Sequence, residues 1–288
     1  MNIKQSLYNY FILTRLNKPY AIMLLVIPCF LGLALSSFLL KINNLDLLKY
    51  YVIFFIGSIV MRSFGCIVND YFDKDIDKQV ERTKNRPLAS GAVSTIEALF
   101  LLIILGSIGL YLLTFLSKFA ILVAVSSLIL VIIYPLSKRF FKVPQLVLGL
   151  AFNWGVLVAG ALFLDTINLP ILILFISLIF WTLAYDTIYA YQDYEDDKKL
   201  NIYSLTLLLH NNYKKTIAIF YLLTYKILFM LALYIKLSLF FYIFLTMALV
   251  YILVKLYKLN KEDTKECFNF FKDNIYYGLL IWIGLLLA

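Results

Sequence analysis

Long apolar runs alternate with short polar loops along almost the whole chain. A helix that crosses the hydrocarbon core of a bilayer, which is about 30 Å thick, needs roughly 20 predominantly apolar residues. Nine runs approach that length and predict membrane-spanning helices near residues 20–40, 50–68, 98–116, 119–137, 143–164, 166–185, 216–235, 237–254 and 274–288. The pattern predicts an all-α, polytopic membrane protein, and we interpret residues 1–288 as a single integral membrane domain.

The composition supports lipid as the solvent of this chain. Hydrophobic residues make up 63% of it and charged residues 15%, whereas soluble domains carry about 25% charged residues. The net charge of +9 comes from short loops between the apolar runs. We therefore relate it to orientation and to anionic lipid headgroups, and we expect no nucleic-acid partner. No obligatory protein partner is indicated.

The basic residues predict an orientation. With a cytoplasmic N-terminus, twenty Lys and Arg residues lie in cytoplasmic loops or ends, against four on the opposite side. Such an excess is typical of cytoplasmic loops. The same parity places the loops that follow the second and sixth predicted spans together on the cytoplasmic side.

The acidic residues gather where those two spans end. Ten of the seventeen fall in two windows, 70–81 and 186–197. If the second helix continues past the membrane, Asp70, Asp73 and Asp77 share one helical face with Asn69. In the second window the same spacing relates Asp186, Tyr189, Asp193 and either Asp196 or Asp197.

Carboxylates stacked at this spacing repel one another, which indicates that a cation is present. Carboxylate oxygens suit Mg²⁺, which commonly takes one or two carboxylates together with substrate phosphates. Two such faces therefore predict a pair of Mg²⁺ ions around a diphosphate. Arg62 lies on the face of Asn69, just inside the membrane, where ionisable residues are functional candidates. The competing interpretation is a solvated loop of mixed charge, and the pairing of two clusters with a buried arginine argues against it.

These motifs resemble the intramembrane prenyltransferases of the UbiA type. The first window fits N-D-x-x-D-x-x-x-D from Asn69 to Asp77, followed by N-R-P-L-x-S-G at residues 85–91. The second fits D-x-x-Y-x-x-x-D-x-x-D-D from Asp186 to Asp197, and residues 134–155 resemble the 4-hydroxybenzoate branch. One departure is visible, because Ile202-Tyr203-Ser204-Leu205-Thr206 replaces the Lys-Ser-Thr run usual in the family.

The resemblance implies nine helices around a central cavity that opens laterally to the bilayer. It implies transfer of a polyprenyl group from polyprenyl diphosphate to the ring carbon of 4-hydroxybenzoate ortho to the hydroxyl, as in ubiquinone biosynthesis. The diphosphate would lie at the cytoplasmic mouth with Mg²⁺ as cofactor. A bacterial inner membrane is the expected location.

Together, spacing and resemblance suggest roles for named residues. The expected magnesium ligands and their supporting carboxylates are Asn69, Asp70, Asp73, Asp77, Asp186, Asp193, Asp196 and Asp197. Arg62 and Lys138 are candidates for the diphosphate, and Arg62 is grouped with Asp73, Asp77, Asp186 and Asp193 as catalytic. For the acceptor carboxylate, Arg139 is the first candidate and Lys74 the second, since arginine binds carboxylates in a bidentate manner. Tyr134, Tyr189 and Trp154 are expected to line the cavity and shield an allylic cation.

Two alternatives stay open. A prenyltransferase of the same superfamily with homogentisate, a naphthoate or haem as acceptor would carry the same acidic motifs. A membrane transporter would also contain acidic residues, but more often near the bilayer midplane.

Overall fold

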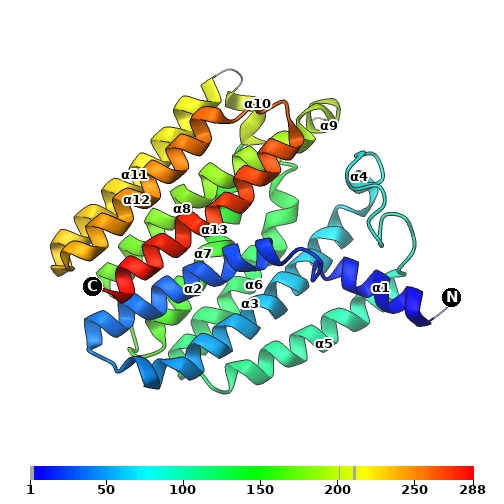
Figure 1. Ribbon diagram of the computed structural model, residues 1–288. Coiled ribbons are helices and arrows are strands. Elements are labelled where there is room, and N and C mark those ends of the chain that lie inside the picture. Colours follow the sequence, from blue (N-terminus) through cyan, green and yellow to red (C-terminus); the bar gives the residue numbers. More distant parts are fainter. Residues whose placement is uncertain (1–2, 201, 210–211) are drawn as a thin grey trace.

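Helices account for all the regular structure that the described residues contain. The computed structural model describes residues 3–200, 202–209 and 212–288, except for the side chains of residues 44–46. Its helices, labelled in Figure 1, are α1 (Ile3–Leu13), α2 (Pro19–Leu40), α3 (Asn44–Phe72), α4 (Lys74–Asp77), α5 (Thr95–Leu113), α6 (Lys118–Ser137), α7 (Pro144–Ala161), α8 (Leu169–Ala190), the 3₁₀ turn η1 (Tyr191–Asp193), α9 (Tyr194–Lys199), α10 (Leu205–Leu209), α11 (Tyr213–Ile235), α12 (Leu239–Lys258) and α13 (Thr264–Leu286). The predicted all-α membrane fold is confirmed.

The central helices of the bundle are α2, α7 and α8, with α11 and α12 along one edge and α5 along the other (Figure 1). In the most apolar stretches of the central three, 67% of the residues are buried, against 6% in α5 and 17% in α6. The apolar surface of α5 and α6 therefore faces lipid. The short helices α4 and α9 lie at the same end of the bundle.

Among the described residues, eight helices are long and apolar enough to cross a membrane, and they correspond to the first eight predicted spans. The ninth prediction, residues 274–288, overlaps α13, which begins ten residues earlier, at Thr264, and ends at Leu286. The first half of α13 is polar and carries Lys265, Glu266, Lys272 and Asp273. It packs against α2, α8 and α12, so it completes the bundle as an amphipathic helix.

Two helices extend beyond their predicted spans in the way that the acidic motifs require. Helix α3 has 29 residues and is about 43 Å long at about 1.5 Å per residue, which exceeds the hydrocarbon core. Helix α8 continues to Ala190, five residues past its predicted end. Both acidic motifs therefore begin on the ends of long helices.

The N-terminal helix is attached through the start of α5. Ser94 caps α5 in a capping box: its Oγ accepts from the Glu97 amide at 3.2 Å, and its own amide donates to Glu97 Oε2 at 2.8 Å. The Tyr10 hydroxyl of α1 donates to Glu97 Oε1 at 2.7 Å. Such capping satisfies backbone groups that the first turn of a helix leaves unpaired.

Close contact between α2 and α7 depends on Gly32. A Cβ atom at this position would lie 2.9 Å from the Ala159 Cβ and 3.0 Å from the Val156 Cα. Because a backbone atom cannot move aside as a flexible side chain can, this contact admits no larger residue.

We expect Gly32→Val to lower the free energy of unfolding by about 1–3 kcal/mol through overpacking. Thermal unfolding in detergent measures the effect. Gly57→Ala is the control, since its new Cβ would meet its nearest neighbour, Leu112 Cδ1, at 3.9 Å. Unfolding of Gly32→Val at the wild-type temperature would contradict the packing argument.

Candidate active site

The first acidic motif keeps one helical face across the junction of α3 and α4. The Asp73 amide donates to the Asn69 carbonyl at 2.9 Å, and the Asp77 amide donates to the Asp73 carbonyl at 2.7 Å. These bonds continue the helical i→i−4 pattern beyond Phe72, where α3 ends. Asn69, Asp70, Asp73 and Asp77 consequently line one cavity.

The second motif lines the same cavity from the opposite side. Asp186 and Tyr189 extend from α8, Asp193 ends η1, and Asp197 lies on α9. Asp196 is not among the lining residues, and its Oδ2 instead accepts a hydrogen bond from the Glu81 amide at 3.2 Å. The two clusters, more than 100 residues apart in sequence, thus face each other across one space.

The cavity encloses about 590 Å³ and has two chemically different ends. Charged residues of the two motifs surround one end, and aliphatic residues of α3, α5 and α6 surround the other. This volume lies within the range of sites that hold small molecules and cofactors, about 300–1,000 Å³. A ligand with a charged head and an apolar tail matches both ends.

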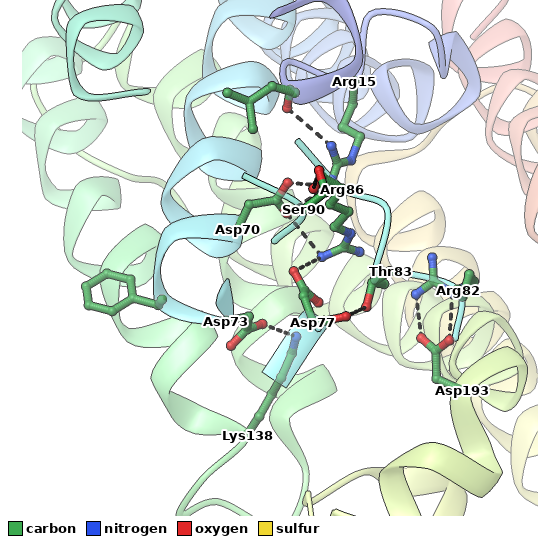
Figure 2. Close-up of polar contacts among 12 residues, drawn as sticks. Arg15, Asp70, Asp73, Asp77, Arg82, Thr83, Arg86, Ser90, Lys138 and Asp193 are labelled. Carbon is green, nitrogen blue, oxygen red and sulfur yellow. Dashed lines mark hydrogen bonds and ion pairs between the residues drawn. The ribbon is translucent and has the colours of Figure 1, made fainter. Parts of the chain in front are cut away.

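Basic side chains hold the carboxylates of the first motif (Figure 2). Arg15 Nη2 lies 2.8 and 2.6 Å from the two Asp70 carboxylate oxygens. Arg86 Nη1 donates to Asp70 at 3.1 Å and to Asp77 at 2.8 Å. Burial raises the pKa of Asp77, and the positive charge of Arg86 opposes that rise. The pairing compensates the cost of burying these charges.

Two further ion pairs connect the motifs to other parts of the fold. Lys138, directly after α6, donates to Asp73 Oδ2 at 2.9 Å. Arg82, in the loop after α4, makes a bidentate ion pair with Asp193 and donates to the Tyr189 hydroxyl at 3.2 Å. The loop that follows the first motif is therefore attached to the second motif, as Figure 2 shows for Arg82 and Asp193.

Four polar groups at the cavity, the Asp73 Oδ1 atom and the side chains of Lys18, Arg62 and Asp186, make no hydrogen bond or ion pair within the described residues. Asp73 is 3% exposed, and its Oδ1 accepts no hydrogen bond there. Asp186 makes no ion pair in that part of the chain, nor do Lys18 and Arg62. The Arg62 guanidinium lies 5.2 Å from the Phe152 ring centre. Buried polar groups are normally hydrogen-bonded, so these four are available to a ligand.

The structure brings some predicted substrate residues to the cavity and not others. Arg62, Tyr134, Lys138, Tyr189 and Trp154 line it. Arg139 and Lys74 are not among its lining residues. Arg139 is exposed and donates to the Phe72 carbonyl at 2.7 Å. The structure thus places neither candidate for the acceptor carboxylate at the cavity. For Arg139 the reason is that it follows Lys138 directly, and consecutive residues on a helical turn point in different directions.

Sequence reasoning missed Arg15 and Lys18, which entered only the orientation count. Both line the cavity. Burial and the neighbouring guanidinium groups of Arg82, Arg15, Arg86 and Arg62 lower the pKa of Lys18 to about 8. Their position directly before the first span, on the side of the acidic motifs, was the available signal.

The segment that departs from the family pattern also reaches the cavity. Ile202, Tyr203 and Ser204 line it, and the Tyr203 amide donates to the Lys138 carbonyl at 3.0 Å. Ser204 Oγ accepts from the Gln145 side chain at 3.1 Å. The segment therefore supports the backbone around Lys138 and adds no basic side chain.

Residues 25–283 match the model of the UbiA prenyltransferase family. This chain belongs to that family. It is 39% identical over 280 residues to the 4-hydroxybenzoate octaprenyltransferase of Francisella tularensis subsp. mediasiatica, covering 97% of each chain. It is 41% identical over 222 residues to the enzyme of the same name from Shewanella sp. strain ANA-3, covering 77% and 76%.

Solved structures of UbiA homologues share the fold. The apo homologue from Aeropyrum pernix K1 aligns with a TM-score of 0.75 and 22% identity, covering 91% of this chain and 96% of that one. The homologue from Archaeoglobus fulgidus bound to GPP and Mg²⁺ gives a TM-score of 0.66 and 19% identity, covering 95% and 99%. At these identities the likeness concerns the fold of the UbiA family.

We expect Arg15→Met to lower the free energy of unfolding by about 2–4 kcal/mol, because Asp70 loses its shortest charged hydrogen bonds while Arg86 remains. In a double-mutant cycle with Asp70→Asn, the two changes should be coupled by about 1 kcal/mol or more. Lys78→Met is the control, since its pair with Asp75 is exposed. Additive effects of Arg15→Met and Asp70→Asn would contradict a direct interaction.

Proposed function

We propose that this protein transfers a polyprenyl group from polyprenyl diphosphate to the ring carbon of 4-hydroxybenzoate ortho to the hydroxyl, releasing diphosphate. The observation that carries the proposal is one cavity with two acidic motifs at its polar end and an aliphatic arm at the other. This matches a donor with an anionic head and an isoprenoid tail. The names of the 39–41% identical relatives support the same reaction.

The reaction breaks the bond between the allylic carbon and the diphosphate oxygen. Negative charge grows on the leaving diphosphate while positive charge develops on the carbon. Lys138 and Arg62 offer fixed positive charge to the leaving group, and such charge acts more strongly away from bulk water. The Tyr134 and Tyr189 rings line the same cavity and present π faces that stabilise a cation. The acceptor ring carbon then forms the new bond and loses its proton.

The residues present fit a magnesium requirement. The uncommitted oxygens at the cavity, Asp73 Oδ1 and the Asp186 carboxylate, are hard donors of the kind that Mg²⁺ prefers. In the described residues, no three acidic, His or Cys side chains already form a complete metal site, and Mg²⁺ commonly takes some of its ligands from substrate phosphates. Bound Mg²⁺ would neutralise charge on the leaving diphosphate. The residues that we propose to hold it are Asn69, Asp73, Asp77, Asp186 and Asp193, with Asp70 and Asp197 in support.

We assign the acceptor carboxylate to Lys18. It lines the cavity without an acidic partner among the described residues, and four guanidinium groups lie near enough to lower its pKa. An amine at the cavity without an acidic partner favours an anion there. Tyr20 and Phe271 line the cavity on the same side as Lys18 and give an aromatic ring apolar surface.

For the setting of the enzyme, we propose a bacterial inner membrane. The loop charges favour an orientation in which the N-terminus, α4 and α9 lie on the cytoplasmic side. We also propose that residues 1–288 act as one domain, since the cavity takes its walls from α2, α3, α5, α6, α7 and α8.

We expect Asp73→Asn to reduce turnover by about 10²-fold or more, because it removes a carboxylate that is proposed to hold Mg²⁺ where negative charge develops on the leaving group. The assay mixes membranes, polyprenyl diphosphate, Mg²⁺ and labelled 4-hydroxybenzoate, and measures label in the lipid extract. EDTA should abolish the signal. Asp75→Asn is the matched control from the same short helix, since Asp75 is exposed and pairs only with Lys78 in the described residues.

Magnesium-dependent labelled lipid in the wild type and in Asp75→Asn, but not in Asp73→Asn, is the expected result. Folded wild-type protein that yields no product from 4-hydroxybenzoate would overturn the acceptor assignment. Homogentisate and a naphthoate in parallel reactions then distinguish the other branches of the superfamily.

We expect Lys18→Met to raise KM for 4-hydroxybenzoate about tenfold or more while leaving KM for the prenyl diphosphate within about twofold. The reason is the loss of a charge that contacts only the acceptor. Arg139→Met is the control, because Arg139 donates to a backbone carbonyl outside the cavity. An effect of Arg139→Met that equals that of Lys18→Met would contradict the assignment.

A further inference from the structure

The aliphatic arm of the cavity extends deep into the membrane along α3. Its lining residues on this helix recur every three or four positions from Asn69 back to Ile53, so one face of α3 forms its wall. Ile53 and Asn69 are sixteen positions apart along the helix, which corresponds to about 24 Å at about 1.5 Å per residue. The arm therefore crosses most of the hydrocarbon core, which is about 30 Å thick.

Four glycines of α3 and α5 line this arm in two levels. Gly65 of α3 and Gly106 of α5 lie nearer the acidic motifs, and Gly57 of α3 and Gly109 of α5 lie deeper. The levels follow from their neighbours: Gly106 faces Phe64, whereas Gly109 faces Val60 and Gly57 faces Leu112. Along α3, Gly65 is about 6 Å and Gly57 about 18 Å from Asn69. We call these pairs the upper and lower glycines.

These glycines do not serve close helix packing. A Cβ atom at any of the four would meet its nearest neighbour at 3.8–4.0 Å, which is ordinary contact distance. At Gly32, Gly160 and Gly278, by contrast, it would lie within 3.0 Å of a neighbouring helix. Glycine destabilises a helix interior by roughly 0.5–1 kcal/mol relative to alanine. At the upper and lower positions no packing constraint offsets that cost, and the missing side chains leave room inside the arm.

The arm opens to lipid between α5 and α6. Leu110 of α5 and Val125 of α6 both line it and are nevertheless 65% and 43% exposed. Helix α5 packs on α3, and α6 packs on α7. At its polar end the same cavity contains Asp73, whose Oδ1 has no partner in the part of the chain that the structure describes. The arm thus connects the head-group site with the acyl region of the bilayer.

We propose that the lower glycines, Gly57 and Gly109, determine the length of prenyl chain that the enzyme accepts. This inference rests on the proposed function and adds a specificity determinant to it. The diphosphate lies at the acidic motifs, the first isoprene units pass the upper glycines, and later units pass the lower glycines. A bulky side chain at the lower level closes the arm to long tails and leaves short tails unaffected.

The test compares geranyl diphosphate with an octaprenyl diphosphate as donors for labelled 4-hydroxybenzoate. Gly109→Phe and Gly57→Leu should each lower kcat/KM for the octaprenyl donor about tenfold or more relative to the geranyl donor. Gly106→Phe, at the upper level, should impair both donors. Ile108→Phe is the matched control: Ile108 neighbours Gly109, is 40% exposed and does not line the cavity.

The outcomes separate this inference from the proposed function. A wild-type protein inactive with both donors would overturn the proposed function. An active wild type, with an unchanged donor ratio in both Gly109→Phe and Gly57→Leu, would overturn the role of the lower glycines alone. Because these substitutions lie on different helices, misfolding of one leaves the other informative, and thermal unfolding in detergent identifies such a case. An equal shift in Ile108→Phe would also count against the inference.

Discussion

The rest of this site depends on the need to compensate carboxylates buried at a membrane surface. Asp70, Asp73 and Asp77 are each at most 5% exposed, and an unpaired buried charge costs several kcal/mol. Their cationic partners come from three separate parts of the chain: Arg15 precedes α2, Arg86 lies in the loop after α4, and Lys138 follows α6. Because the carboxylates at the end of α3 must be paired with these cations, the N-terminal segment, the loop at residues 78–94 and the end of α6 are held in position.

The two halves of the bundle use small residues in opposite ways. Around α2, α7 and α8, glycines such as Gly32 bring backbones into direct contact and form a closely packed, buried centre. Around α3, α5 and α6, glycines border open space, and most of the apolar surface of α5 and α6 faces lipid. The closely packed centre positions Asp186 and Tyr189 of α8, while the half with less buried helices provides the apolar arm. Helices α2, α7 and α8 therefore position the groups that take part in the chemistry. Helices α3, α5 and α6 provide access for a lipid substrate.

Sequence alone predicted most of this arrangement because it follows from local periodicity. Apolar run length gave the spans, and helical spacing placed Asn69, Asp73 and Asp77 on one face. Local periodicity does not predict contacts between segments that are far apart in the sequence. Arg139 and Lys138 are adjacent in sequence, yet only Lys138 faces the cavity, because the turn at the end of α6 separates their directions. Arg15 and Lys18 were overlooked because nothing local relates them to Asp70, 55 residues away from Arg15. The start of α13 was misplaced because its polar first half does not resemble a membrane span.

Electrostatic balance in the cavity relates the binding of metal to that of diphosphate. The described lining residues include equal numbers of basic and acidic side chains. The six basic ones are Arg15, Lys18, Arg62, Arg82, Arg86 and Lys138, and the six acidic ones are Asp70, Asp73, Asp77, Asp186, Asp193 and Asp197. With these groups ionised, the walls carry no net charge. A diphosphate alone, or Mg²⁺ alone, would add an uncompensated charge to a site lined by protein, where charges interact more strongly than in bulk water. The two together leave a much smaller imbalance. For the proposed reaction, metal and diphosphate are therefore expected to bind cooperatively.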